Sequence, residues 1–189
     1  MAHTNEEWAK YRTTVREFDS VLEHAKAVSG STVGLTSEDR SQIFGEQIFV
    51  KMLAHCVTLR QLSPDPTRQK PSEFWDLPSV NAIARCVIEA HDAFAYVTNA
   101  DIDDAERDFR LTLWELHDKT RRLKMLEAIG STDPRNAQIR SDADRLLSKT
   151  TEHARFGSLP VPLRKKLTAD PPGLLPESTR PMFRMRGGL

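Results

Sequence analysis

Residues 84–96 read ARCVIEAHDAFAY, and this stretch decides the expected fold, because a few charged residues recur at helical spacing among apolar ones. At about 100° per residue, five polar side chains fall within one arc about 80° wide. They are Asn81, Arg85, Glu89, Asp92 and Tyr96. The rest of the circumference is mostly apolar, whereas a surface helix gives about half of its circumference to water. We therefore expect a helix over residues 79–98 at the centre of a helical bundle.

We expect Thr36 and Ser79 to cap the helices that begin there and Gly130 to close another. Four further segments carry the apolar spacing of helices. They are residues 5–28, 36–62, 102–129 and about 134–155. No segment has the alternating pattern of a strand. The sequence therefore predicts an all-α fold, a mostly antiparallel bundle of about five helices over residues 1–155. Residues 156–189 contain six prolines, and we expect an irregular, proline-rich tail there.

The composition describes an ordinary globular chain, with 39% hydrophobic and 29% charged residues. The 27 basic and 27 acidic residues cancel, so no overall positive field attracts nucleic acid. The charge is uneven, since residues 156–189 hold six Lys or Arg against two Asp or Glu. No run approaches the roughly 18 apolar residues of a membrane span, and no apolar leader follows a basic start. We expect a cytoplasmic protein without membrane contact, with Cys56 and Cys86 as buried free thiols.

The polar arc has two interpretations. In the first, Arg85 and Glu89 form an i,i+4 ion pair, assisted by Asp92, on the one edge of the helix that reaches water. In the second, the arc faces the bundle interior or a subunit interface and lines a polar pocket. Arg85 would then need its carboxylate, because an unpaired buried charge costs several kcal/mol.

Residues 77–109, LPSVNAIARCVIEAHDAFAYVTNADIDDAERDF, resemble a bacterial family of helical domains of unknown function. The family pattern is a mid-helix A-R-x-x-x-E, then an aromatic near the helix end and an acidic start to the next helix. Ala84, Arg85, Glu89 and Tyr96 occupy those positions, and the likeness covers roughly residues 40–128. The resemblance implies a helical fold and carries no activity.

A second resemblance is to HEPN-type helical domains, many of which are ribonucleases with an arginine followed on one helix by a histidine. Arg85 and His91, with five residues between them, fill those places. The resemblance implies a dimer interface where His91 assists proton transfer at the ribose 2′-hydroxyl, Arg85 holds the phosphate and Glu89 orients Arg85. Asn81, Asp92 and Tyr96, which share the polar arc, are expected as binding residues apart from this resemblance.

Arg110 and His117 also have an arginine-to-histidine spacing, but charged residues line the same helix face. These are Asp103, Glu106, Arg121 and Lys124. We interpret this face as solvated surface. Histidines occur once in each expected helix, without the H-x-x-x-H or E-x-x-H spacing that places two metal ligands together. We therefore expect neither a metal ion nor a cofactor.

Two functions remain as expectations. The first is a non-catalytic helical module that binds a protein partner or forms a homodimer, with the polar arc and the basic tail as contacts. The tail interleaves basic and apolar side chains over residues 180–186, which also suits RNA phosphates. The second is a HEPN-type ribonuclease or nucleotide-binding protein that uses Arg85 and His91.

Overall fold

The computed structural model describes residues 5–65, 67 and 76–175, and α-helix is the main regular structure among them, with no strand. The all-α fold class is confirmed. The chain divides into two compact units, unit 1 (Met1–Thr98) and unit 2 (Asn99–Leu189). The grouping of residues 1–155 as one domain stays a prediction.

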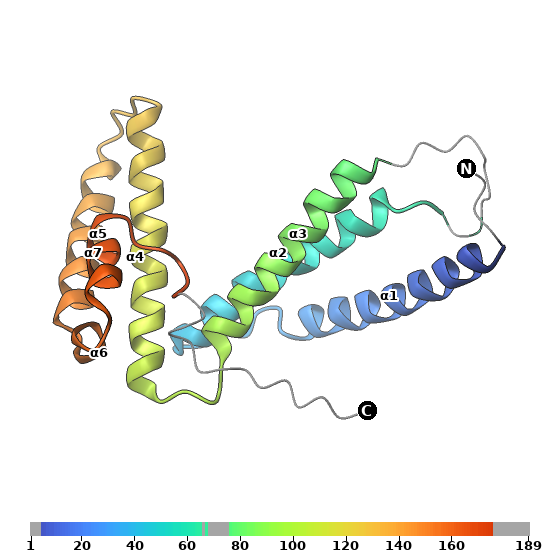
Figure 1. The fold of residues 1–189 in the computed structure, drawn as a ribbon, viewed down its shortest axis with the longest axis horizontal. Coiled ribbons are helices and arrows are strands. Elements are labelled where there is room, and N and C mark those ends of the chain that lie inside the picture. Colours follow the sequence, from blue (N-terminus) through green and yellow to red (C-terminus); the bar gives the residue numbers. More distant parts are fainter. Residues whose placement is uncertain (1–4, 66, 68–75, 176–189) are drawn as a thin grey trace. The chain divides into compact units, whose positions relative to one another are not determined.

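Unit 1 contains three helices, drawn from blue to green in Figure 1. They are α1 (Asn5–Ser31), α2 (Arg40–Leu62) and α3 (Leu77–Thr98). Two polar contacts join α1 to α2. The Tyr11 hydroxyl donates to the carbonyl oxygen of Pro64 at 2.7 Å, and Arg60 Nε lies 2.6 Å from Asp19 Oδ1. Since the start of α1 meets the end of α2, the two helices are antiparallel.

The α2–α3 hairpin depends on a close approach at Gly45, which is buried in α2. A Cβ atom at Gly45 would lie 2.7 Å from Cγ2 of Thr98, well inside van der Waals contact. Nearby, the rings of Phe49 and Phe94 have centroids 6.1 Å apart. The start of α2 therefore meets the end of α3, and the absence of a side chain at Gly45 lets the helices come together.

The first turns of these helices are capped by acids other than the residues expected from the sequence. The α2 cap is Asp39, whose Oδ1 accepts from the Ser41 amide at 2.8 Å, and not Thr36. At α3, Asp76 Oδ1 accepts from the Ser79 amide at 3.2 Å, so Ser79 is the donor and not the cap. Hydrogen bonds from the side chain and the backbone of Ser79 lower the pKa of Asp76. Both helices keep their expected type, with starts shifted by two to four residues.

Unit 2 contains the remaining helices. They are α4 (Asp104–Ala128), α5 (Arg135–Glu152), α6 (Ala154–Gly157) and α7 (Val161–Ala169). Two ion pairs join α4 to α5: Lys149 Nζ to Asp108 Oδ1 at 2.9 Å, and Arg140 Nη2 to Glu127 Oε1 at 2.6 Å. Because one pair lies near each end, α4 and α5 are antiparallel, as Figure 1 also shows.

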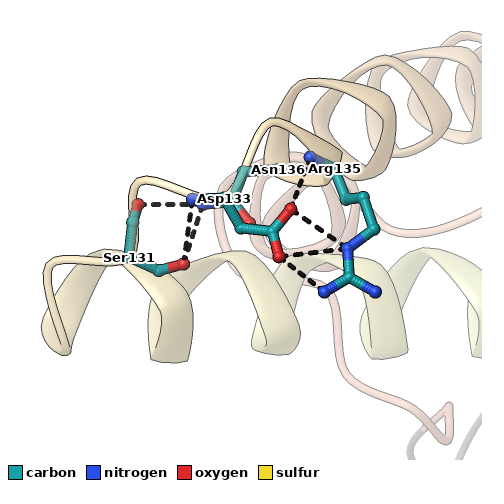
Figure 2. Close-up of polar contacts among 4 residues, drawn as sticks. All are labelled: Ser131, Asp133, Arg135 and Asn136. Carbon is teal, nitrogen blue, oxygen red and sulfur yellow. Dashed lines mark hydrogen bonds and ion pairs between the residues drawn. The ribbon is translucent and has the colours of Figure 1, made fainter.

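The turn between α4 and α5 is held by polar contacts (Figure 2). Gly130 ends α4 with φ +64°, as the sequence predicts for a helix-closing glycine. Asp133 accepts from the Arg135 amide at 2.8 Å and from Arg135 Nη2 at 2.6 Å. Asn136 Nδ2 donates to the Ser131 carbonyl at 2.9 Å. The bonds from Arg135 lower the pKa of Asp133 to about 2.

The chain stays ordered in helices beyond the expected end of the bundle. Helix α7 lies inside the stretch that we expected to be irregular, and Leu167 on it is fully buried. The described chain then continues to Leu175, which is also buried. The RNA- or partner-binding prediction for residues 180–186 lies outside the described residues.

The most enclosed helix is α4 and not α3, which corrects the expectation from the sequence. All of residues 109–113 are buried, so this stretch of α4 is covered on every side. On α3, by contrast, Ile88 is 62% exposed. The main helix contact of α3 within unit 1 is with α2, and one neighbour cannot cover a whole circumference.

Candidate functional site

The polar arc of α3 is largely open to water. Asn81, Arg85, Glu89 and Asp92 are exposed, whereas Tyr96, at the end of the arc, is buried. The arc therefore does not line a pocket inside unit 1. Its first four members form a charged edge that another molecule can reach.

Arg85 and Glu89 form the expected i,i+4 pair. Arg85 Nε donates to Glu89 Oε1 at 2.8 Å, with the side chains 81% and 62% exposed. The hydrogen bond to Glu89 and the charge of Glu89 raise the pKa of Arg85. A pair this exposed is screened by water and contributes little to folding stability. It also orients the guanidinium, which carries further donors on its two terminal nitrogens.

His91 lies on a different face of α3 from Arg85. Its side chain is 67% exposed, and its Nδ1 lies 3.7 Å from Asp92 Oδ1. No described contact joins His91 to Arg85, since each has a different acidic neighbour. At about 100° per residue the two side chains diverge by about 120°. One phosphodiester could meet both groups only with help from further residues.

Ile88 adds an apolar surface to this edge. It lies about 60° around the helix from Arg85 and is well exposed. Ala84 and Ala95 flank it on the same side and are half-buried. The outward face of α3 thus combines a charged row with one large apolar side chain between small ones.

A buried ionic cluster lies in unit 2, where the sequence suggested a solvated surface. Arg110 Nε donates to Glu106 Oε1 at 2.8 Å, and the two side chains are only 3% and 9% exposed. The second carboxylate oxygen, Oε2, lies 2.7 Å from Arg155 Nε. The Glu106 cluster, which is Glu106, Arg110 and Arg155, therefore ties α4 to α6.

The Glu106 cluster has the geometry of a structural element. Glu106 Oε1 accepts a hydrogen bond from Arg110, and Oε2 forms an ion pair with Arg155 without hydrogen-bond geometry, so two guanidinium groups hold the charge of this carboxylate. Beside it, the rings of Phe109 and His153 have centroids 5.0 Å apart. The buried hydroxyl of Thr112 has no hydrogen-bond partner in the described chain. The signal for this burial was the apolar content of residues 109–116 on all sides of the helix.

His117 is covered by the chain that follows α7. Its Nδ1 donates to the carbonyl oxygen of Pro171 at 2.7 Å, and Gly173 lies so close that a Cβ there would be 3.1 Å from the ring. Asp170 pairs with Lys124 Nζ at 2.7 Å. That bond and the Lys124 charge lower the pKa of Asp170. The interpretation of Arg110 and His117 as one solvated surface is wrong. The Arg110 side chain is buried, and residues 171–173 cover His117.

Within residues 5–65, 67 and 76–175, no three His, Cys, Asp or Glu side chains gather as a metal site. None of the helices in that part of the chain has the length and apolarity to cross a membrane. Both cysteines are unpaired and half-buried, and burial raises the pKa of Cys56.

Comparison of the chain with protein-family models, with curated proteins and with solved structures finds no match. What is known of the candidate site therefore comes from its own geometry. That geometry favours the outward edge of α3 as the surface for a ligand.

Proposed function

We propose that this protein is a non-catalytic helical module that associates with a protein surface, in the first instance that of a second copy of the chain. The observation that carries the proposal is the outward edge of α3. There a 62% exposed Ile88 lies beside the exposed Arg85–Glu89 pair and Asp92. Apolar area rimmed by charges is typical of contact surfaces between proteins.

The distribution of exposed apolar side chains supports the same unit as the contact region. Of the twelve large hydrophobic residues found exposed in the described chain, nine belong to unit 1 and three to unit 2. The nine are Val21, Val28, Val33, Leu35, Ile43, Val50, Leu62, Leu77 and Ile88. Ile43 and Val50 are seven residues apart, the repeat of helices that pair with other helices. Association would remove part of this apolar area from water.

The chemistry of the arc also favours binding over catalysis. Arg85 and His91 both lie in water, and neither has the buried, preorganised surroundings that make such groups effective in catalysis. Glu89 and Asp92 add negative charge at the place where a ribonuclease would have to hold phosphate. The bacterial family, the HEPN resemblance and the cytoplasmic location stay predictions.

The experiment is sedimentation of the full-length chain over roughly a thousandfold range of concentration, with an incubation with single-stranded RNA in parallel. We expect the mass to rise towards that of a dimer with concentration, and the RNA to stay intact. A monomer throughout would overturn self-association. RNA cleavage that disappears in Arg85→Ala and His91→Ala would overturn the non-catalytic function in favour of the HEPN-type enzyme.

A further inference from the structure

We propose that the α3 strip, defined as Asn81, Arg85, Ile88, Glu89 and Asp92, pairs with the same strip of a second copy in antiparallel orientation. In this pairing Arg85 of each copy faces the partner's Asp92. The inference rests on the proposed self-association and names its surface and register. It follows from charge complementarity within the strip, from exposure and from the symmetry of a twofold axis.

Two charged positions of the strip, Arg85 and Asp92, are complementary to each other across a twofold axis. Arg85 and Asp92 are seven residues apart, which is about 10 Å along a helix and nearly the same direction around it. A twofold axis midway between Ile88 and Glu89 places residue n of one helix opposite residue 177 − n of the other. Arg85 then meets the partner's Asp92, and symmetry repeats the contact at the other end. One strip thus forms two intermolecular ion pairs.

The side chains are available for these contacts. Arg85 uses Nε for Glu89, and a guanidinium carries further donors on its two terminal nitrogens that suit a second carboxylate. Asp92 is 56% exposed, and its contact with His91 Nδ1, at 3.7 Å, is longer than a hydrogen bond. Arg85 can therefore bridge its own Glu89 and the partner's Asp92 without losing the bond that orients it.

The apolar part of the strip fits the same axis. Measured along the helix, Ile88 lies less than about 1.5 Å, the rise of one residue, from the twofold axis. The Ile88 side chains of the two copies therefore come together on the same side of the helix pair. Ala84 and Ala95 lie on that side, and such small residues permit close approach of two helices. Pairing would therefore remove from water the Ile88 side chain, which is exposed in unit 1.

The charges also select the orientation. In a parallel pair, Arg85 would face the partner's Arg85 and Asp92 the partner's Asp92, and like charges across an interface repel. The antiparallel pair replaces both repulsions by attractions. A single helix pair is a small interface, so we expect a weak dimer that needs high concentration.

The test is a charge exchange in the full-length chain, read by sedimentation. Arg85→Asp and Asp92→Arg each place like charges opposite one another, and each should weaken dimerisation by about tenfold or more. The double variant Arg85→Asp/Asp92→Arg restores opposite charges and should recover the wild-type dissociation constant. The matched control is the exposed Lys26–Glu23 pair of α1 at 2.7 Å, where Lys26→Glu and Glu23→Lys make the same charge changes and should have no effect.

The outcomes separate the two proposals. A wild-type monomer at every concentration would overturn both. A wild-type dimer that is insensitive to the Arg85 and Asp92 variants, or not rescued by the double variant, would overturn the strip pairing alone. Circular dichroism on each variant checks folding, which exposed positions should not disturb.

Crosslinking gives a second readout that does not depend on charge. In a Cys56→Ser/Cys86→Ser background, Ile88→Cys should form a covalent dimer with a short bismaleimide, because the axis brings the two positions together. Ala82→Cys is the control on the same helix, exposed but far from its symmetry mate in this register. Equal crosslinking at both positions, or none at Ile88→Cys in a chain that dimerises, would overturn the register.

Discussion

Each unit contains an Arg–Glu pair at i,i+4 spacing, and the two pairs have the same geometry in opposite surroundings. In α3, Arg85 Nε lies 2.8 Å from Glu89 Oε1, and in α4, Arg110 Nε lies 2.8 Å from Glu106 Oε1. The first pair is 81% and 62% exposed, the second 3% and 9%. The two pairs have the same bond length but contribute differently to stability, because the interaction between two charges is stronger in the protein interior than in water.

The difference assigns different roles to the two helices. The α3 pair can be broken with little cost to the fold, so its guanidinium is free to serve a contact with another molecule. The α4 pair cannot be opened without leaving a charge in the interior, so its function is to hold α4 and α6 together.

The largest effect is expected for Glu106→Ala. The substitution removes the carboxylate between Arg110 and Arg155 and leaves the Arg110 guanidinium buried without it, which should lower the free energy of unfolding by about 3 kcal/mol. Urea denaturation of the full chain measures the change. Glu89→Ala, which breaks the exposed pair at the same distance, is the control and should leave the urea midpoint unchanged.

A double substitution sharpens this prediction. Glu106→Leu combined with Arg110→Met replaces both buried charges by apolar groups of similar length, and should recover most of the stability lost in Glu106→Ala. If the double variant were as unstable as the single one, the loss would come from packing and not from the buried charge of Arg110. The contrast between the two Arg–Glu pairs would then fail.

The next effect concerns how unit 1 is held together without buried charges. Gly45→Ala adds a methyl group 2.7 Å from Thr98 Cγ2, and Thr98 is held in place by its hydroxyl bond to the Phe94 carbonyl at 2.8 Å. The overlap should cost about 1–3 kcal/mol, which outweighs the gain of up to about 1 kcal/mol from better helix propensity. We expect a net loss of stability in urea denaturation.

Gly30→Ala provides the matched control for Gly45→Ala. Gly30 lies in the last turn of α1, and nothing lies within 4 Å of a Cβ atom placed there. The same change of residue should therefore raise stability slightly or leave it unchanged. If both variants were stabilised to the same extent, the helices would not be in close contact at Gly45.

Helix type and order were predictable, because the apolar spacing of each segment reports which side of it avoids water. The surroundings of each helix were not predictable in the same way. On α3 the apolar residues cover most of the circumference, yet Ile88 remains exposed because α2 covers one side. The periodicity of apolar residues predicts a helix, but it does not show how many other helices pack against that helix.

The same limit explains why the Glu106 cluster was missed. Glu106 and Arg110 lie among other charged positions of α4, a pattern typical of a solvated face. Arg155, which completes the cluster, is 45 residues further along the chain and joins it only through α6. Of the predicted site, the sequence anticipated the Arg85–Glu89 bond, whereas the buried counterpart required the tertiary structure.

The smallest effect is expected at Asp133, in the turn that precedes α5. Asp133 has a usual pKa of 3.8 that is lowered to about 2, mainly by the side-chain bonds from Arg135. Because the folded state holds the proton less tightly than the unfolded state, the carboxylate stabilises the fold above about pH 4. That contribution is lost as the pH falls from about 4 towards 2. The stability difference between wild type and Asp133→Asn should therefore be present at about pH 5 and shrink in this window.

Arg135→Ala separates the charge at this cap from the cap itself. The variant removes the guanidinium and keeps the backbone amide that donates to Asp133, so the pKa of Asp133 should return part of the way to its usual value (Figure 2). Urea midpoints measured across the acid range should then lose the wild-type advantage at a higher pH. An unchanged acid profile in Arg135→Ala would mean that the backbone amide, and not the exposed ion pair, sets the pKa. In that case Asp133, whose side chain is 33% exposed, would depend on the local fold and not on its exposed partner Arg135.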